Sequence, residues 1–325
     1  MENPTVITAR RDVPAIAVTQ LRKTYAGGVE AVKGIDFTVR AGEAFGLLGP
    51  NGAGKSTTVG MLTTTVLPTG GTARLAGFDV VADAISARRV SSVVFQDAVV
   101  DRELTGAANL RIHAQLWGVD ATPARQRIAR LAGQLGIADI LERRVASYSG
   151  GQRRRLEIAR ALVSEPRVLF LDEPTVGLDA RIRHELLEVI GQLRDRADTT
   201  ILLTTHYLDE AERLCDRIAI MHDGHIVALD TPAALLATLG TEIVELRVNG
   251  PADAALAALR SRAIAGADAF VVGSTVTLPL HGRPSVDALA AIHEARLPVA
   301  SLSTRRPTLD DVYLRLTGDR IAAAA

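Results

Sequence analysis

One glycine-rich run dominates the first quarter of the chain: Gly49-Pro50-Asn51-Gly52-Ala53-Gly54-Lys55-Ser56-Thr57. It matches G-x-x-x-x-G-K-[ST], the pattern of a P-loop whose backbone N–H groups surround a triphosphate. The apolar residues 44–48 before it predict a buried strand, and residues 57–62 after it can begin a helix. In that setting Lys55 is expected at the β- and γ-phosphates and the Ser56 hydroxyl at Mg²⁺. We therefore assign the whole run to a nucleotide site in an α/β, P-loop NTPase fold.

Length and composition limit the other possibilities. With 325 residues, the chain is long enough for about two domains. Lys and Arg total 37, equal to Asp and Glu, and a zero net charge argues against a dedicated nucleic-acid binder. The single cysteine, Cys215, excludes an internal disulfide and is expected to be a small buried hydrophobe in a reducing compartment. The longest uncharged window, 56–73, is rich in threonine and glycine, so we expect no membrane span and any transport to need a separate channel.

The rest of the first 238 residues predicts three structural parts. Alternating residues at 16–18 and 35–39 indicate an antiparallel sheet before the P-loop. A helical periodicity without strands runs from about 102 to 162 and interrupts the α/β pattern. We predict a flexible N-terminal tail at 1–13 and a nucleotide-binding domain at 14–238, with an inserted helical subdomain at about 97–165.

The sequence pattern changes after Gly240, where predicted strands and helices follow in the order β-α-β-β-α-β. This order predicts a small two-layer α+β accessory domain over residues 239–325. It contains no cluster of acids, bases or metal ligands that would indicate a second reaction.

Two apolar strands end in polar residues suited to phosphoryl transfer. The strand at 168–171 leads into Asp172 and Glu173, and the strand at 199–205 leads into His206. Parallel strands of an open α/β sheet bind ligands at their carboxyl edge. One carboxylate can therefore hold Mg²⁺ through water while the other orients the attacking water.

A second anion-binding signal lies in the helical block, at Tyr148-Ser149-Gly150-Gly151-Gln152. Serine and glycines at a helix N-terminus can bind phosphate. One P-loop with two phosphate sites suggests that a second copy of the chain completes each site. Alone, this motif would be a weak turn signal, and the arginines at 153–155 would most often form a solvated helix face.

Together with the P-loop, the motif resembles L-S-G-G-Q, the signature of ABC transporter ATP-binding subunits, with Tyr148 at a packing position in place of Leu. The resemblance spans about residues 15–235. It implies ATP and Mg²⁺ as cofactors, Lys55, Gln96, Glu173 and His206 as catalytic residues, and a homodimer. In detail, it implies that Tyr25 stacks on adenine and that Gln96 is the Q-loop glutamine near Mg²⁺ and the membrane partner. Asp172 would be the Walker B aspartate, which joins Ser56 at the metal, and Glu173 the catalytic glutamate. A D-loop would end at Asp179, and His206 would be the switch histidine at the γ-phosphate.

Three further stretches resemble the ATPase subunits of daunorubicin/doxorubicin-resistance exporters: 148–156, 204–211 and 307–314. Such subunits are similar bacterial ATPases at the cytoplasmic face of the cell membrane, peripheral to it, that drive a separate transmembrane permease. Ala107-Ala108 departs from the charged pair often found there.

Other functions remain open at this stage. Within transport, the chain could serve an importer or a lipid or polysaccharide exporter. A soluble ABC-type ATPase would be expected to carry two nucleotide domains or a long coiled coil, and neither pattern is present. A P-loop kinase or GTPase has no use for the signature or for His206.

Overall fold

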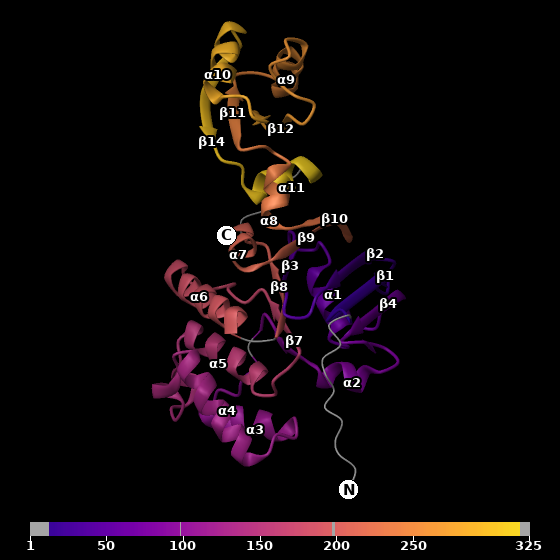
Figure 1. Ribbon diagram of the computed structural model, residues 1–325, viewed down its shortest axis with the longest axis vertical. Helices are drawn as coiled ribbons and strands as arrows, with labels where there is room; N and C mark the ends of the chain where they lie inside the picture. Colours follow the sequence, from indigo (N-terminus) through magenta and orange to yellow (C-terminus); the bar gives the residue numbers. More distant parts are fainter. Residues whose placement is uncertain (1–12, 98, 197–198, 319–325) are drawn as a thin grey trace.

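The computed structural model describes residues 13–97, 99–196 and 199–318, so the predicted tail at 1–13 lies outside the described residues apart from Val13. Within these ranges the chain forms three sheets, shown in Figure 1. The central one has six strands in the order β10-β9-β3-β8-β7-β6, and the other two are four-stranded, in the orders β2-β1-β4-β5 and β12-β13-β11-β14. This agrees with the predicted α/β core, antiparallel subdomain and α+β domain.

The central sheet places the polar strand ends side by side. Leu48 pairs with Thr205 and Asp172 with Thr204, so the P-loop and both polar strand ends share one edge. Every neighbouring pair is parallel except the β9–β10 hairpin. The strands are β3 (Ala44–Leu48), β6 (Ser91–Val94), β7 (Val168–Asp172), β8 (Thr200–Thr205), β9 (Arg217–His222) and β10 (His225–Asp230).

Apolar side chains on both faces of the central sheet explain its continuous hydrophobic strands. On one face, Phe45 of β3 stacks on Phe37 with ring centroids 5.3 Å apart, within a core that also buries the P-loop helix. That face is covered by α1 (Lys55–Leu62), α2 (Ala84–Arg89) and the sheet of β1 (Ile16–Thr24), β2 (Glu30–Val39), β4 (Gly70–Leu75) and β5 (Phe78–Asp79).

Helices cover the opposite face, and the inserted block extends from them at the bottom of Figure 1. Tyr148 is buried there and its hydroxyl donates to the Ile140 carbonyl at 2.5 Å, which agrees with a packing role. The helices are α3 (Gly106–Leu116), α4 (Ala121–Gln134), α5 (Gly150–Leu162), α6 (Ala180–Arg196) and α7 (Leu208–Leu214), with short 3-10 turns at Ala138–Ile140 and Val145–Ser147.

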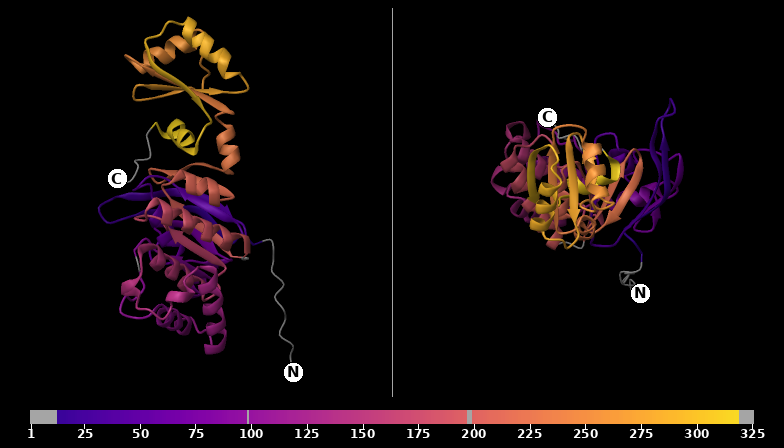
Figure 2. Two further views of the ribbon diagram at one scale, coloured as in Figure 1. Left: turned by 90° about the vertical axis from the view of Figure 1, so that its left-hand side faces the viewer. Right: turned by 90° about the horizontal axis from the view of Figure 1, so that it is seen from above.

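The C-terminal domain has the expected β-α-β-β-α-β order, and all neighbouring strands are antiparallel. Figure 2 shows its two helices on the sheet face that points away from the central sheet. Its own core contains Val244, Leu256 and Leu278. The elements are β11 (Glu242–Val248), α9 (Ala252–Ser261), β12 (Phe270–Val272), β13 (Thr275–Leu280), α10 (Ser285–Glu294) and β14 (Val299–Arg305).

The last helix, α11 (Leu309–Thr317), returns to the nucleotide-binding part and packs on α7 and α8 (Pro232–Ala237). Tyr313 is buried in the main core, and its hydroxyl lies 2.8 Å from His222 Nδ1 at the end of β9. At the start of the helix, burial raises the pKa of Asp311, but hydrogen bonds from Arg305 and Thr308 outweigh it and hold that pKa below its usual range. The contact of Tyr313 with His222 thus connects α11 to β9, the strand that pairs with β3 before the P-loop.

A cavity of about 220 Å³ lies between α3, β6 and α5. Trp117 lines this cavity and is half-buried. His113 lies beside it, and its pKa is lowered to about 4, mainly by burial and also by the Arg160 charge. A neutral histidine is therefore built into this junction at neutral pH.

The His113 environment predicts a specific loss of stability in acid. An unfolded histidine has a pKa of about 6.5. Between that value and the folded pKa of about 4, protons bind the unfolded chain preferentially. The free energy of unfolding should therefore fall as pH falls through this window, and His113→Gln should remove that part of the fall. Urea unfolding of the wild type and of His113→Gln at pH 7.5 and pH 5 measures this free energy. An equal decrease in the two proteins would contradict the assignment of the effect to His113.

Candidate nucleotide site

The P-loop fits between neighbouring backbone segments that leave no room for side chains. Gly54 has φ 104°, and a Cβ there would lie 2.4 Å from the Ala31 carbonyl oxygen. A Cβ on Gly49 would lie equally close, 2.4 Å, to the Met221 carbonyl oxygen. Gly54 precedes α1 without a side-chain cap, so the first N–H groups of the helix remain available to an anion. Ala53 is buried beneath the loop, whereas Asn51 and Gly52 are exposed.

Lys55 already points back into this loop. Its ammonium is buried, donates to the Gly49 and Pro50 carbonyls at 2.8 and 3.1 Å, and lies 3.2 Å from Glu173 Oε1. A charged group held in this way can exchange carbonyl partners for phosphate oxygens without a large movement.

Glu173 joins the lysine to the histidine. Its second carboxylate oxygen lies 3.3 Å from His206 Nδ1, without the geometry of a hydrogen bond. Both ring nitrogens of His206 are buried and lack a hydrogen-bond partner among the described residues. Glu173 also has φ 46°, a left-handed conformation that costs a non-glycine residue energy and is concentrated at functional sites. The unpartnered nitrogens fit a ligand with oxygen or hydroxyl groups at this position.

Ser56 and Asp172 form the adjoining side of the site. Ser56 Oγ lies 3.4 Å from Asp172 Oδ1, and the Thr204 hydroxyl donates to the same oxygen at 2.5 Å. In the described part of the chain no group of three or more His, Cys, Asp or Glu could hold a metal alone. A hydroxyl and a carboxylate do suit Mg²⁺, which commonly takes only one or two protein ligands and completes its shell with phosphates and water.

Four other predicted positions lie outside this cluster. Tyr25 is exposed, with its hydroxyl 3.4 Å from Thr57 Oγ1 at the P-loop helix. Gln96 is exposed after β6 and makes no hydrogen bond, to Asp172 or elsewhere, within the described residues. Asp179 caps α6 by accepting from the Ile182 N–H at 3.0 Å.

The fourth position is the signature motif, which caps α5. Ser149 and Gln152 form a reciprocal capping box, with bonds of 3.2 and 2.9 Å. A Cβ on Gly151 would lie 2.4 Å from Ile182 Cγ2, so α5 needs glycine to approach α6. Within the described ranges no hydrogen bond or ion pair joins residues 149–152 to the P-loop of the same chain. Gly150 and the exposed Ser149 remain accessible to another molecule.

Glu210, a buried carboxyl group next to the site, was not among the predicted residues. One oxygen accepts from Thr175 at 2.5 Å and from Arg183 at 2.8 Å, and the other accepts from Thr205 at 2.9 Å. Burial raises its pKa. Glu210 therefore joins the loop after Glu173 to the strand end before His206. The polar Thr204-Thr205 pair closing an apolar strand was the available signal for such a network.

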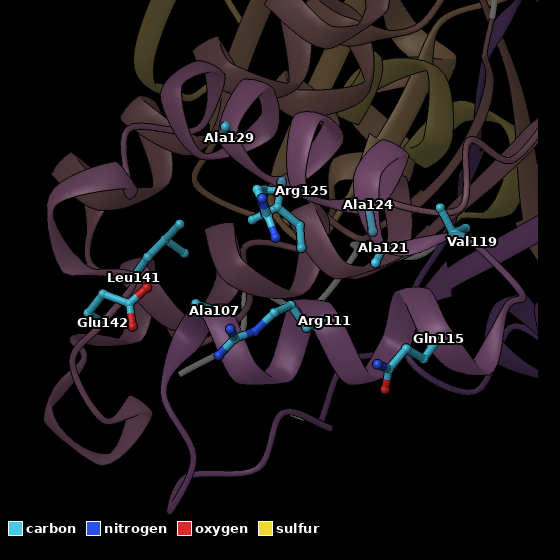
Figure 3. A pocket seen from close by; sticks show the side chains of 11 residues that line it. Ala107, Arg111, Gln115, Val119, Ala121, Ala124, Arg125, Ala129, Leu141 and Glu142 are labelled. Carbon is cyan, nitrogen blue, oxygen red and sulfur yellow. The ribbon is translucent and has the colours of Figure 1, made fainter.

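A pocket of about 380 Å³ between α3 and α4 is separate from this site. Figure 3 shows the side chain of Arg111, from α3, and that of Arg125, from α4, on opposite sides of it. Gln115, Leu141 and Glu142 also line it, and none of the predicted nucleotide-site residues does.

Comparisons with known proteins agree with the geometry. Residues 32–176 match the ABC transporter family model. The chain is 43% identical over 310 residues to the daunorubicin/doxorubicin resistance ATP-binding protein DrrA of Streptomyces peucetius, covering 94% of this chain and 92% of that one. It is 41% identical to the doxorubicin resistance ATP-binding protein DrrA of Mycobacterium tuberculosis, covering 95% and 96%.

A solved structure of cbiO1 from Clostridium perfringens, part of an ABC transporter complex, is 27% identical with a TM-score of 0.64. The match covers 69% of this chain and 91% of that chain. The P-loop edge, the signature helix and these similarities together show that the chain belongs to the ABC transporter ATP-binding proteins, ATPases whose ATP hydrolysis is coupled to transport.

Proposed function

We propose that this chain is the energy-coupling subunit of an exporter of drugs or other hydrophobic compounds. It would act as a homodimer with a separate permease, at the cytoplasmic face of the membrane. The observation that carries the ATPase part is the contact of Glu173 with both Lys55 and His206 at one sheet edge. The export part rests on relatives named for drug resistance that match along more than nine-tenths of both chains.

In this proposal the chain positions ATP and does little covalent chemistry. The P-loop amides and Lys55 bind the phosphates, and Ser56 and Asp172 would hold Mg²⁺, which neutralises charge on the β- and γ-phosphates when bound. Once the γ-phosphate has replaced Glu173 as the partner of Lys55, Glu173 orients the attacking water. His206 contacts the same phosphate through a ring nitrogen. Tyr25, exposed beside Thr57, offers its ring to adenine.

The dimer follows from the exposed signature cap. Ser149 and Gly150 present a helix N-terminus with no bond to their own P-loop, and Asp179 lies exposed at the start of the neighbouring helix α6. A second chain would bring its cap to the phosphates held by the first. Each ATP would then be enclosed by the P-loop of one copy and the cap of the other.

In this proposal the permease contacts the junction of the helical subdomain with the core. Val99, Ile112 and Leu116 are exposed apolar residues there, with Leu116 79% exposed. The cavity lined by Phe95 and Trp117 lies at the same junction, next to Gln96. No helix in the described ranges is long and apolar enough to span a bilayer.

The division into a nucleotide-binding domain at 14–238 and an accessory domain at 239–325 is also part of the proposal. The accessory domain would support pairing or permease assembly, because every proposed phosphate contact precedes residue 239. The anchoring of α11 on β9 through Tyr313 and His222 supports this as a fixed appendage.

The proposed role of Glu173 predicts a separation of binding from turnover. Glu173→Gln should bind ATP with a dissociation constant within about threefold of wild type, because the P-loop contacts persist, while kcat falls by about a hundredfold or more. It should also accumulate an ATP-bound dimer, visible by size-exclusion chromatography with light scattering.

The matched control is Glu185→Gln, on the exposed side of α6, where the carboxylate pairs with Arg155 and Arg181. It should leave kcat within about twofold, as expected for an exposed ion pair. Near-normal turnover by Glu173→Gln would show that another group orients the water.

A further inference from the structure

Arg154, the middle residue of the arginine run, is buried, whereas its neighbours Arg153 and Arg155 are half-buried. Only 6% of Arg154 is exposed. Glu157, one helical turn later, is also buried and forms an ion pair with it at 3.0 Å. Removing two charges from water is unfavourable unless both are fully hydrogen-bonded. The hydrogen-bond partners of Arg154 and Glu157 therefore indicate the structural role of this ion pair.

All five N–H donors of the Arg154 guanidinium are used, which is the full capacity of an arginine. One of its acceptors is Glu157, and the other four are backbone carbonyls in two segments of the nucleotide site. The acceptors are Pro174 O at 2.7 Å, Asp172 O at 3.1 Å, Glu173 O at 3.2 Å, Glu157 Oε2 at 3.0 Å and Phe95 O.

Glu157 completes the arrangement from the other side. Its second oxygen accepts from the Val99 N–H at 2.9 Å. Phe95 and Val99 flank Gln96, so the ion pair holds the chain on both sides of that residue. The same guanidinium holds the backbone that carries Asp172 and Glu173. Three segments, including the helix capped by Ser149, therefore have their relative positions set by one pair of side chains.

We propose that the Arg154–Glu157 pair positions the Gln96 segment and the Glu173 backbone relative to the signature helix, so that a displacement of one is transmitted to the others. The proposal rests on the proposed roles of Gln96 and Glu173. Arg154 touches neither substrate nor reacting atoms; it is a positioning residue. Backbone carbonyls cannot adjust by rotating a side chain, so their alignment depends on the planar fork of the guanidinium.

Arg154→Lys tests this while keeping the positive charge beside Glu157. An ammonium has three donors and a different shape, so it cannot satisfy the four carbonyls together. We expect kcat to fall by about tenfold or more, since misplacement by about 1 Å can cost up to a hundredfold, while the dissociation constant for ATP stays within about threefold. The matched control is Arg155→Lys, at a residue that contacts the Leu135 carbonyl and Glu185 instead. It should change kcat by less than about twofold, as for a surface ion pair.

A double-mutant cycle separates positioning from general stability. If Arg154 acts through the Gln96 segment, adding Arg154→Lys to Gln96→Ala should lower kcat by less than about half of its logarithmic effect in the wild-type chain. A merely structural arginine would give additive effects and a lower unfolding midpoint. Additive effects, wild-type kcat for Arg154→Lys, or an equal loss for Arg155→Lys would each overturn the proposal.

Two reference variants, Gln96→Ala and Glu173→Gln, distinguish failure of the positioning proposal from failure of the proposed function. If Gln96→Ala and Glu173→Gln both keep wild-type kcat, the proposed function fails; if they are slow and Arg154→Lys is not, only the positioning proposal fails. Should Arg154→Lys not fold, Glu157→Gln replaces it, because its amide oxygen can still accept from Val99 while the ionic contact is lost. Glu157→Gln should then lower kcat non-additively with Gln96→Ala, and wild-type kcat or additivity would overturn the proposal.

Discussion

A carboxylate held between a lysine and a histidine is the contact on which the candidate site depends. Glu173 reaches Lys55 with one oxygen and His206 with the other, at 3.2 and 3.3 Å. The three residues lie just beyond the carboxyl ends of three neighbouring parallel strands, with Lys55 reached through the P-loop, and the register of these strands brings their ends to one edge. Because Lys55 and Glu173 are buried, their ion pair attracts more strongly than one in water and favours this arrangement before any ligand arrives. A triphosphate can then replace the carboxylate as the partner of Lys55 and leave it free to orient water.

Around this contact, buried polar side chains connect the loops that carry the site. Glu210 joins the segment after Glu173 to the strand end before His206, and Arg154 joins the Glu173 backbone to the segment of Gln96. Both are ionisable and buried, and a buried charge is unfavourable unless it is paired and fully hydrogen-bonded. Half of their bonds go to loop residues: Phe95, Glu173, Pro174 and Thr175. The network therefore makes loop geometry depend on α5 and α7, the helices next to the predicted dimer contact and the C-terminal anchor.

Local patterns were sufficient to predict the fold, and they single out Lys55, Glu173 and His206, which the structure brings together. The P-loop glycines, the two apolar strands and the β-α-β-β-α-β order each reflect steric or periodic constraints that a few neighbouring residues express. The sequence could not show that Arg154 is buried, because its neighbours Arg153 and Arg155 are chemically identical and only packing distinguishes them. Nor could it show that Trp117 lines a cavity, or that α11 leaves the C-terminal domain to join the main core, since both depend on contacts between distant segments.

The central claim is that two chains share each ATP, with Lys55 from one and Ser149 from the other. The most direct test mixes chains carrying Lys55→Ala with chains carrying Ser149→Ala, each impaired alone. Every mixed dimer would contain one site with both residues intact and one site with neither. We predict that the mixture hydrolyses ATP faster than the mean of the two separate variants. A rate equal to that mean, in a mixture shown to contain mixed dimers, would contradict the shared site and place both residues on the same nucleotide within one chain.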